Sequence, residues 1–242
     1  MHHSIRLPIA SGMVGRWPIA RVTGLSGLLM VAAIVINGPL AGAVERYPSF
    51  WTSSAGADLG RFLQDPDRVG RSLIFFALSN LIFIFAIPFF AGLGVLVKDV
   101  DPSGFLRGIA AIAVPLFLAG GLASEVFSHG LPAVVGAIPG FQFDLDSVLM
   151  VQGLQYVALV QGQVALGVAV VALSFAGWIG GLLPRWVWWL GAAAGLIDLV
   201  RPFAVTNPPI LIAAFVPTFL WVVVTSVVLM RRSAPSPAAG EG

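Results

Sequence analysis

The longest uncharged stretch of the chain lies between Arg71 and Lys98, where 26 consecutive residues carry no charged side chain. As an α-helix this stretch is roughly 39 Å long, which exceeds the ~30 Å hydrocarbon thickness of a bilayer. Similar uncharged stretches cover residues 22–44, 108–124, 147–184, 186–197 and 202–230. Because a backbone in lipid must satisfy its own hydrogen bonds, these repeated apolar stretches predict a bundle of transmembrane helices.

The pattern therefore predicts an all-α fold, a polytopic bundle of about six spans. Gly180, Gly181 and Pro184 are expected to end the long fourth span near residue 180. A tight turn at residues 206–209 joins the last two spans. The membrane domain covers 22–232, between an N-terminal segment 1–21 and a small, Pro-containing tail 233–242 that is expected to be disordered. The six spans are predicted near 22–44, 72–97, 106–128, 148–181, 186–206 and 208–230.

The loop between the first two spans contains a short amphipathic pattern. Leu59, Phe62 and Leu63 fall on one face of a helix near residues 55–64, and Pro66 follows it. The pattern predicts a short helix at the membrane surface, lying over the outer mouth of the bundle.

The composition excludes several classes of protein. The chain is 58% hydrophobic and 10% charged, whereas soluble domains carry about 25% charged residues, so no separate soluble domain is expected. A net charge of +2 arising at membrane edges does not favour a nucleic-acid partner. There is no cysteine for a thiolate metal site, no glycine-rich loop for a nucleotide and no histidine pair within the spans for haem. We therefore expect no cofactor, no metal and no nucleotide.

The lysines and arginines predict the orientation of the chain in a plasma membrane. With both termini cytoplasmic, eight basic residues lie inside and five lie outside. The same topology brings Trp17, Trp178, Trp186, Trp188 and Trp189 near the inner interface, where an aromatic belt is typical. We therefore predict a multi-pass plasma-membrane protein with both termini cytoplasmic.

Polar side chains at membrane depth are the most informative positions, because each one costs free energy unless it is paired or faces a cavity. With this topology they gather in the outer half of the bundle, and the inner half has few. They allow two readings: a polar cavity that binds a ligand, or hydrogen bonds that hold the helices together. The candidate ligand-binding residues are Asn37, Asn80, Gln152, Gln155, Tyr156, Asp198 and Arg201.

The spacing of these candidates along two of the spans indicates which of them lie close together. Asp198 and Arg201 are three residues apart on the fifth span and can form an ion pair. Gln152, Gln155 and Tyr156 share a face of the fourth span, whereas Gln161 falls on the opposite side. Asp198 is expected to face the bundle interior and to contact Arg201 or a polar residue of another span.

Glu125 and His129 are four residues apart near the outer end of the third span. If the helix continues through both, the carboxylate can orient the imidazole as an acid–base pair or contribute two metal ligands. Gly130 and Pro132 instead favour a helix that ends here, with His129 at its cap. Glu125, His129 and Asp198 are the candidate catalytic residues if the protein is an enzyme.

Three segments stand out as whole stretches: RVTGLSGLLMVAAIVINGPLAG, AGADLGRFLQDPDRVGRSLIFFALSNLIFIFAIPFFAGLGVLV and GLLPRWVWWLGAAAGLIDLV. These segments resemble a broad group of bacterial multi-span integral membrane proteins that share a domain of unknown function. The resemblance implies a helical bundle in the plasma membrane and implies no activity.

The sequence leaves the function open between two main hypotheses. The first is a bundle that binds a lipid-like or small amphipathic ligand, or that partners another membrane protein. The second is an intramembrane enzyme acting on a lipid or isoprenoid substrate, with acid–base carboxylates in the outer half. A small transporter is less favoured, because no internal repeat is visible.

Overall fold

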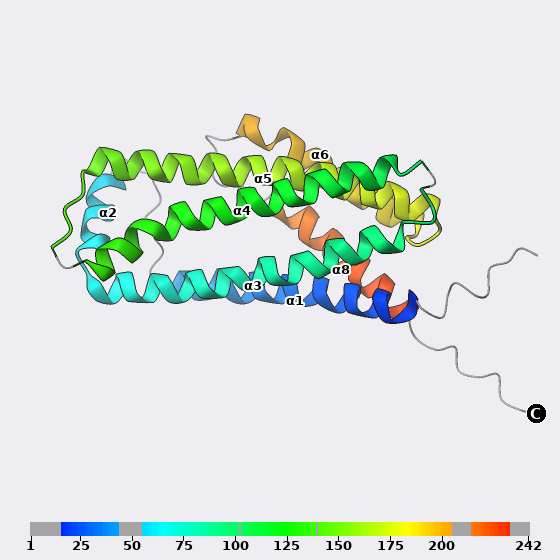
Figure 1. Ribbon diagram of the computed structural model, residues 1–242, viewed down its shortest axis with the longest axis horizontal. Helices are drawn as coiled ribbons and strands as arrows, with labels where there is room; N and C mark the ends of the chain where they lie inside the picture. Colours follow the sequence, from blue (N-terminus) through cyan, green and yellow to red (C-terminus); the bar gives the residue numbers. More distant parts are fainter. Residues whose placement is uncertain (1–15, 44–54, 102, 139, 205–213, 233–242) are drawn as a thin grey trace, which may run out of the picture.

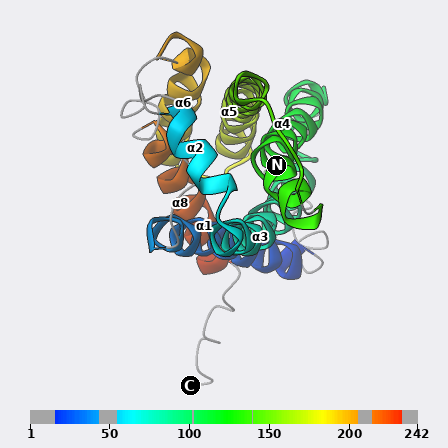
Figure 2. The same ribbon diagram turned by 90° about the vertical axis from the view of Figure 1, so that its left-hand side faces the viewer.

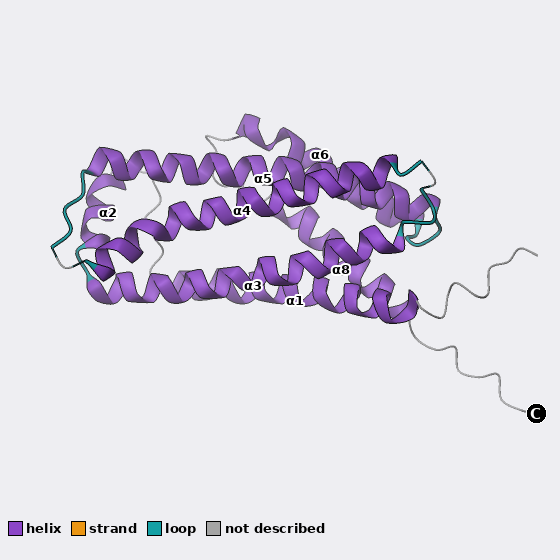
Figure 3. Ribbon diagram, viewed as in Figure 1, coloured by secondary structure: helices purple, strands orange, loops and turns teal. Residues whose placement is uncertain are grey.

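The computed structural model describes residues 16–43, 55–101, 103–138, 140–204 and 214–232. All regular elements of these residues are helices (Figure 3), which confirms the predicted all-α fold. The predicted turn at 206–209, the tail 233–242 and most of the segment 1–21 lie outside the described residues. The helices are α1 (Arg16–Ala43), α2 (Ala55–Leu63), α3 (Pro66–Leu96), α4 (Phe105–Ala137), α5 (Leu145–Ile179), α6 (Arg185–Val200), the 3₁₀ helix η1 (Arg201–Ala204) and α8 (Phe215–Arg232).

Six of these helices form a ring around a common axis. In the end-on view of Figure 2, α1, α3, α4, α5, α6 and α8 follow one another around the bundle, and each packs on its two neighbours. Figure 1 shows α3, α4 and α5 running the full length, whereas α6 and α8 occupy only one part of it. The first residues of α1 and the last residues of α8 lie at the same end, which we call the terminal end; α2 lies at the opposite end.

Five helices are long and apolar enough to cross a membrane, so the protein is a membrane-embedded helical protein. They are α1, α3, α4, α5 and α8. The predicted fifth span, 186–206, is shorter than expected: α6 has 16 residues, which is roughly 24 Å of helix, and η1 follows it. The predicted fourth span is one unbroken helix that ends at Ile179, in agreement with the stop expected near residue 180.

Two apolar clusters lie at different heights along the bundle. The larger one fills the half near the terminal end, where Phe89, Phe117 and Trp221 are buried together. The smaller one lies under α2 at the opposite end, where Leu59, Phe62 and Leu63 pack against residues of α3 and α5. The helix predicted near 55–64 is α2, and its apolar face is at most 2% exposed.

Loop carboxylates fix the starts of two long helices. The Asp144 carboxylate caps α5 by accepting hydrogen bonds from the backbone N–H and the hydroxyl of Ser147, which lower its pKa. The pKa of Asp101 is also lowered, first by the backbone N–H of Arg107 and then by the Ser103 hydroxyl. At the terminal end, the Arg232 guanidinium donates to the carbonyl oxygen of Gly181, which ties the end of α8 to the turn after α5.

Four of the predicted belt tryptophans lie around that turn between α5 and α6. Trp178 and Trp188 stack with ring centroids 6.2 Å apart, and Trp189 lies against Trp188. Trp186 and Trp189 are each more than half exposed on the outside of the bundle. Exposed indoles at one level of an apolar bundle are typical of a membrane interface.

Candidate functional site

Most of the predicted site residues lie in a middle layer of the bundle, between the two apolar clusters. On α3 this layer extends from Val69 of the smaller cluster to Ala86 of the larger one, roughly 25 Å of helix. The corresponding part of α4 carries Glu125 and His129, and that of α5 carries Gln152 and Tyr156. The polar side chains that the sequence analysis singled out therefore lie at similar heights on neighbouring helices.

A chain of polar contacts joins three helices within this layer. Nδ2 of Asn37 on α1 donates to Oγ of Ser79 on α3 at 2.9 Å. The Ser79 side chain also hydrogen-bonds the carboxyl group of Glu125 on α4. Asn37 and Glu125 are thus linked through a serine that the sequence analysis did not single out.

Glu125 and His129 form a pair at the end of this chain. Nδ1 of His129 lies 3.4 Å from Oε2 of Glu125 and 3.1 Å from the backbone carbonyl oxygen of the same residue. The Phe76 ring lies beside the imidazole, with the two centroids 5.2 Å apart. With Nδ1 facing these oxygens, Nε2 of the imidazole is left for another partner, since the described residues make no hydrogen bond to it.

The alternative in which His129 caps the helix is wrong. α4 continues through Gly130 and Pro132 to Ala137. Pro132 has no N–H to donate to the carbonyl oxygen of Ser128, and prolines of this kind are tolerated in membrane bundles. The helix therefore persists, and it holds the carboxylate and the imidazole on one face.

The pair is only partly closed off. The side chain of His129 is 16% exposed and that of Glu125 is 23% exposed. Oε2 of Glu125 is itself buried and accepts no hydrogen bond from the described residues. A carboxylate oxygen in this state has unused acceptor capacity next to an accessible imidazole.

Asp198 belongs to a second, fully buried group. Its side chain is 0% exposed, and Oδ2 accepts a hydrogen bond from the Thr218 hydroxyl of α8 at 2.8 Å. Its other oxygen lies 3.8 Å from an Nη of Arg201, whose guanidinium stacks 3.7 Å above the Phe215 ring. The predicted inward orientation of Asp198 is confirmed, and its contact on another helix is Thr218.

Two glycines bring α6 close enough to α5 for Asp198 to be enclosed. A Cβ atom on Gly167 would lie 2.7 Å from the carbonyl oxygen of Gly195 and 2.9 Å from Cβ of Asp198. Such distances leave no room for a side chain, so the two backbones are in direct contact. The carboxylate of Asp198 is therefore shielded from lipid by α5 on one side and by α8 on another.

The remaining candidates are distributed between these groups. Tyr156 lies within electrostatic range of Arg201, and Gln152 is buried one turn away on α5. Gln155 is half-buried, and the described contacts do not join it to either group. Asn80 donates to the carbonyl oxygen of Phe76 on its own helix, so its amide is used within α3.

Ser79 and Thr218 are the contact residues that sequence reasoning missed. Each has a buried hydroxyl residue seven positions away on the same helix, Ser72 and Thr225, and this spacing repeats one helix face. Small buried hydroxyls, which the sequence analysis did not consider, also occur inside the bundle near the terminal end. They are Thr23, Ser26, Ser174, Thr225 and Ser226.

Comparison of the chain with protein-family models, with curated proteins and with solved structures gives no match. The function must therefore be argued from the bundle itself. Within the described residues, no group of three or more His, Asp or Glu side chains is placed to hold a metal ion. What the middle layer offers chemically is a carboxylate–imidazole pair that can accept a hydrogen bond or a proton.

Proposed function

We propose that the protein binds a lipid-like or small amphipathic ligand, whose polar end contacts Glu125 and His129. The observation that carries this proposal is the unused acceptor capacity of Glu125, beside a partly exposed imidazole, inside a membrane-embedded bundle. A polar group at this depth is costly unless it has a partner. The preferred polar end is a hydroxyl or an amine, because either can donate to a carboxylate oxygen.

The contrast with Asp198 supports this choice of residues. Asp198 is completely buried and makes a hydrogen bond to another helix, which is what a group that holds helices together requires. Glu125 has a similar link through Ser79. Each carboxylate keeps one oxygen that accepts no hydrogen bond from the described residues, but only the side chain of Glu125 is partly accessible. We therefore assign the ligand contact to Glu125 and His129 and a structural role to Asp198 and Arg201.

A groove on the same side of α4 provides a place for the apolar part of the ligand. It lies between α3 and α4 beneath α2, has a volume of about 560 Å³ and is lined by apolar residues that include Leu63, Leu73 and Ala133. Ligand pockets are commonly 300–1,000 Å³ in volume. Leu73 and Ala133 are each within one helical turn of the Phe76–His129 contact, so the groove ends close to the pair.

The orientation completes the proposal. Both ends of the described chain lie at the terminal end, and that end carries the tryptophan cluster. The excess of basic residues favours a cytoplasmic terminal end in a plasma membrane. In that orientation the ligand enters from the outer half of the bilayer, beside α2.

An intramembrane enzyme is the second candidate, and the 3.4 Å separation within the Glu125–His129 pair favours it. A carboxylate next to Nδ1 fixes the imidazole and leaves Nε2 as a general base. The substrate would be a lipid or an isoprenoid in the same groove. Asp198 would not take part in proton transfer, because its side chain is enclosed and hydrogen-bonded to Thr218.

The test uses three probes with the same apolar chain, namely dodecanol, dodecylamine and dodecanoic acid, added to the purified protein below their micelle concentrations. We expect the alcohol or the amine to raise the thermal unfolding midpoint more than the acid does. A ligand at 100 times its Kd contributes about 2.7 kcal/mol.

Two variants separate the polar contact from the groove. Glu125→Gln should weaken the preference for a donating polar end, and Leu73→Trp should reduce binding of all three probes by filling the groove. Gln155→Leu serves as a control elsewhere in the middle layer and should bind as the wild type does. Equal stabilisation of the wild type, Glu125→Gln and Leu73→Trp by every probe would refute the proposal. Conversion of a probe lost in His129→Asn would favour the enzyme instead.

A further inference from the structure

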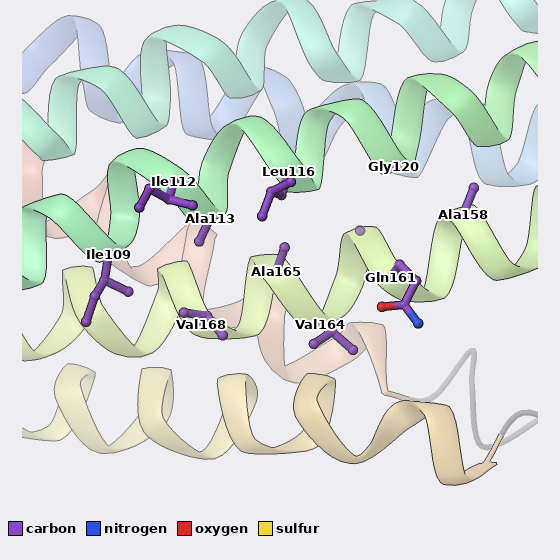
Figure 4. Close-up of a pocket in the computed structure, with 11 residues that line it drawn as sticks. Ile109, Ile112, Ala113, Leu116, Gly120, Ala158, Gln161, Val164, Ala165 and Val168 are labelled. Atoms are coloured by element: carbon purple, nitrogen blue, oxygen red, sulfur yellow. The ribbon is translucent and has the colours of Figure 1, made fainter.

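Large apolar side chains are exposed along the sides of the bundle, among them Ile84 on α3 and Ile112 on α4. In the groove of about 520 Å³ between α4 and α5, Gln161 is the only labelled side chain that carries a nitrogen or an oxygen (Figure 4). Such surfaces contact acyl chains and do not distinguish one phospholipid headgroup from another. Among the described residues, the exposed charged side chains lie toward the two ends of the bundle, so headgroups can be distinguished only there.

The two ends differ in how their basic side chains are paired. At the end that carries α2, Arg61 forms an ion pair with Asp58, and Arg68 forms one with Asp65. Toward the terminal end, four exposed basic side chains make no hydrogen bond or ion pair with the described residues. They are Arg21, Lys98, Arg185 and Arg231.

Acidic groups at the terminal end are too few to neutralise these side chains. Among the side chains that the structure describes there, six are basic and two are acidic, namely Asp99 and Asp101. Asp101 is buried, and its carboxylate accepts hydrogen bonds from the Ser103 hydroxyl and the backbone N–H of Arg107 within its own loop. The terminal end therefore presents an excess of positive charge to its surroundings.

Three basic residues from different segments converge on the turn between α5 and α6, residues 180–184. Arg185 is the first residue of α6 and follows the turn directly. Arg232, at the end of α8, donates a hydrogen bond to a backbone carbonyl oxygen of the turn. Lys98 belongs to the loop after α3, which reaches the same turn, because a Cβ atom on Gly180 would collide with the side chain of Val100. Positive charge from three segments is therefore gathered around one turn.

Tryptophans indicate the depth of this turn in the membrane. Trp186 and Trp189 are each more than half exposed, and both lie within the first five residues of α6. Exposed indoles favour the level of the phospholipid headgroups. Arg185 and Trp189 are four residues apart, so they share a face of α6. The basic side chains around the turn therefore lie at the level of the lipid phosphates.

We infer that the turn between α5 and α6 binds the headgroup of an anionic phospholipid through Lys98, Arg185 and Arg232. A phosphate diester supplies the negative charge that the protein lacks here, and a guanidinium can donate two hydrogen bonds to its oxygens. A zwitterionic headgroup is less suitable, because the same cluster repels its ammonium group. A basic side chain beside an anionic membrane surface contributes about fivefold in affinity, ~1 kcal/mol. The inference concerns the opposite end from Glu125 and His129 and does not depend on the proposed function.

The tryptophans at the turn allow the whole protein to be tested in lipid bilayers. The chain is reconstituted into vesicles of phosphatidylcholine and phosphatidylglycerol in equal amounts, and only one of the two lipids carries brominated acyl chains, which quench tryptophan fluorescence. We expect brominated phosphatidylglycerol to quench more than brominated phosphatidylcholine does, with a preference of at least about tenfold in relative affinity. High salt should reduce the preference, because it screens exposed charges.

Charge-removing variants locate the headgroup contact. Arg185→Gln should lower the preference about fivefold, and adding Lys98→Gln should lower it further. Arg185→Lys keeps the charge and should retain more of the preference than Arg185→Gln does. Arg61→Gln is the matched control, because Arg61 is exposed at the opposite end and is already paired with Asp58. It should leave the preference unchanged.

Several outcomes would overturn the inference. They are equal quenching of the wild type by the two brominated lipids, a preference that the double variant at Lys98 and Arg185 leaves unchanged, and an equal loss in Arg61→Gln and Arg185→Gln. Loss of the preference on adding inorganic phosphate at matched ionic strength would also overturn it, because the turn would then bind a free anion rather than a lipid.

Discussion

Replacing Asp198 with alanine removes the only carboxylate that the described residues place beside Arg201. Asp198 is 0% exposed and Arg201 is 3% exposed, so the guanidinium keeps its charge in an enclosed position. Removing one member of a buried ion pair costs about 3–5 kcal/mol, because the remaining charge stays desolvated. The Phe215 ring beneath the guanidinium offsets only part of this, since a cation–π contact contributes about 0.5–2 kcal/mol.

The structure also ranks the neighbouring variants. Asp198→Asn keeps an oxygen that can accept the Thr218 hydroxyl, so it should cost less than Asp198→Ala. Thr218→Val removes that hydrogen bond and leaves the ion pair, for a cost of about 1.5–3 kcal/mol. The double variant Asp198→Ala with Arg201→Met should recover at least half of the loss, because no charge is then left enclosed.

Thermal unfolding in a mild detergent, with each variant purified in parallel, is the assay. A loss of 3–5 kcal/mol in a chain of this size corresponds to a midpoint lowered by roughly 6–20 °C. A midpoint for Asp198→Ala within about 2 °C of the wild type would refute the reasoning, since that is less than about 1 kcal/mol. If both single variants at Asp198 unfold like the wild type and lose probe binding, the pair is functional rather than structural.

Three further predictions concern other parts of the chain. Gly167→Ala should destabilise the protein by about 1–3 kcal/mol in the same assay, because its Cβ would meet the backbone of α6, whereas Gly153→Ala on the same helix has nothing within 4 Å and should not. The Asp144 cap stabilises the folded state at pH values above 3.8 and is lost as the pH falls through its lower folded-state pKa; Asp144→Asn should therefore be less stable at neutral pH and lose less on acidification. Reporter fusions after Gly242 and within residues 50–60 should report cytoplasmic and external locations respectively, and an external C-terminus would contradict the orientation.

The fold was predictable because span length and hydropathy depend only on composition along the chain. The amphipathic helix α2 was predictable for the same kind of reason, since three apolar residues at helical spacing need one surface to cover them. The end of α4 was not. Gly130 and Pro132 are helix breakers in water, but in a bundle their neighbours satisfy the backbone, so the helix continues to Ala137.

The partners of the site residues were less predictable than the residues themselves. Asp198 and Arg201 are neighbours on one segment, and their spacing alone indicates a contact. The link from Asn37 to Glu125 depends on the relative rotation of three helices, which no periodicity within one helix determines. Ser79 was overlooked in favour of Asn80, although only Ser79 faces α1 and α4; the amide of Asn80 is used within its own helix.

The two intramembrane carboxylates show how burial separates a structural group from a candidate ligand contact. Glu125 is four residues from His129 and Asp198 is three residues from Arg201, so the spacing in the sequence does not distinguish the roles of the two carboxylates.

Asp198 is enclosed where glycines bring α5 and α6 into contact, and the Thr218 hydroxyl of α8 donates a hydrogen bond to it. Glu125 lies between the two apolar clusters, its side chain is 23% exposed, and its Oε2 accepts no hydrogen bond from the described residues. A buried acceptor without a donor carries a free-energy cost of about 1–3 kcal/mol, so any ligand that supplies a donor recovers that cost on binding. Oδ1 of Asp198 also accepts no hydrogen bond from the described residues, but the side chain is 0% exposed and enclosed by α5 and α8, so we predict that a ligand does not reach it and gains nothing from Asp198.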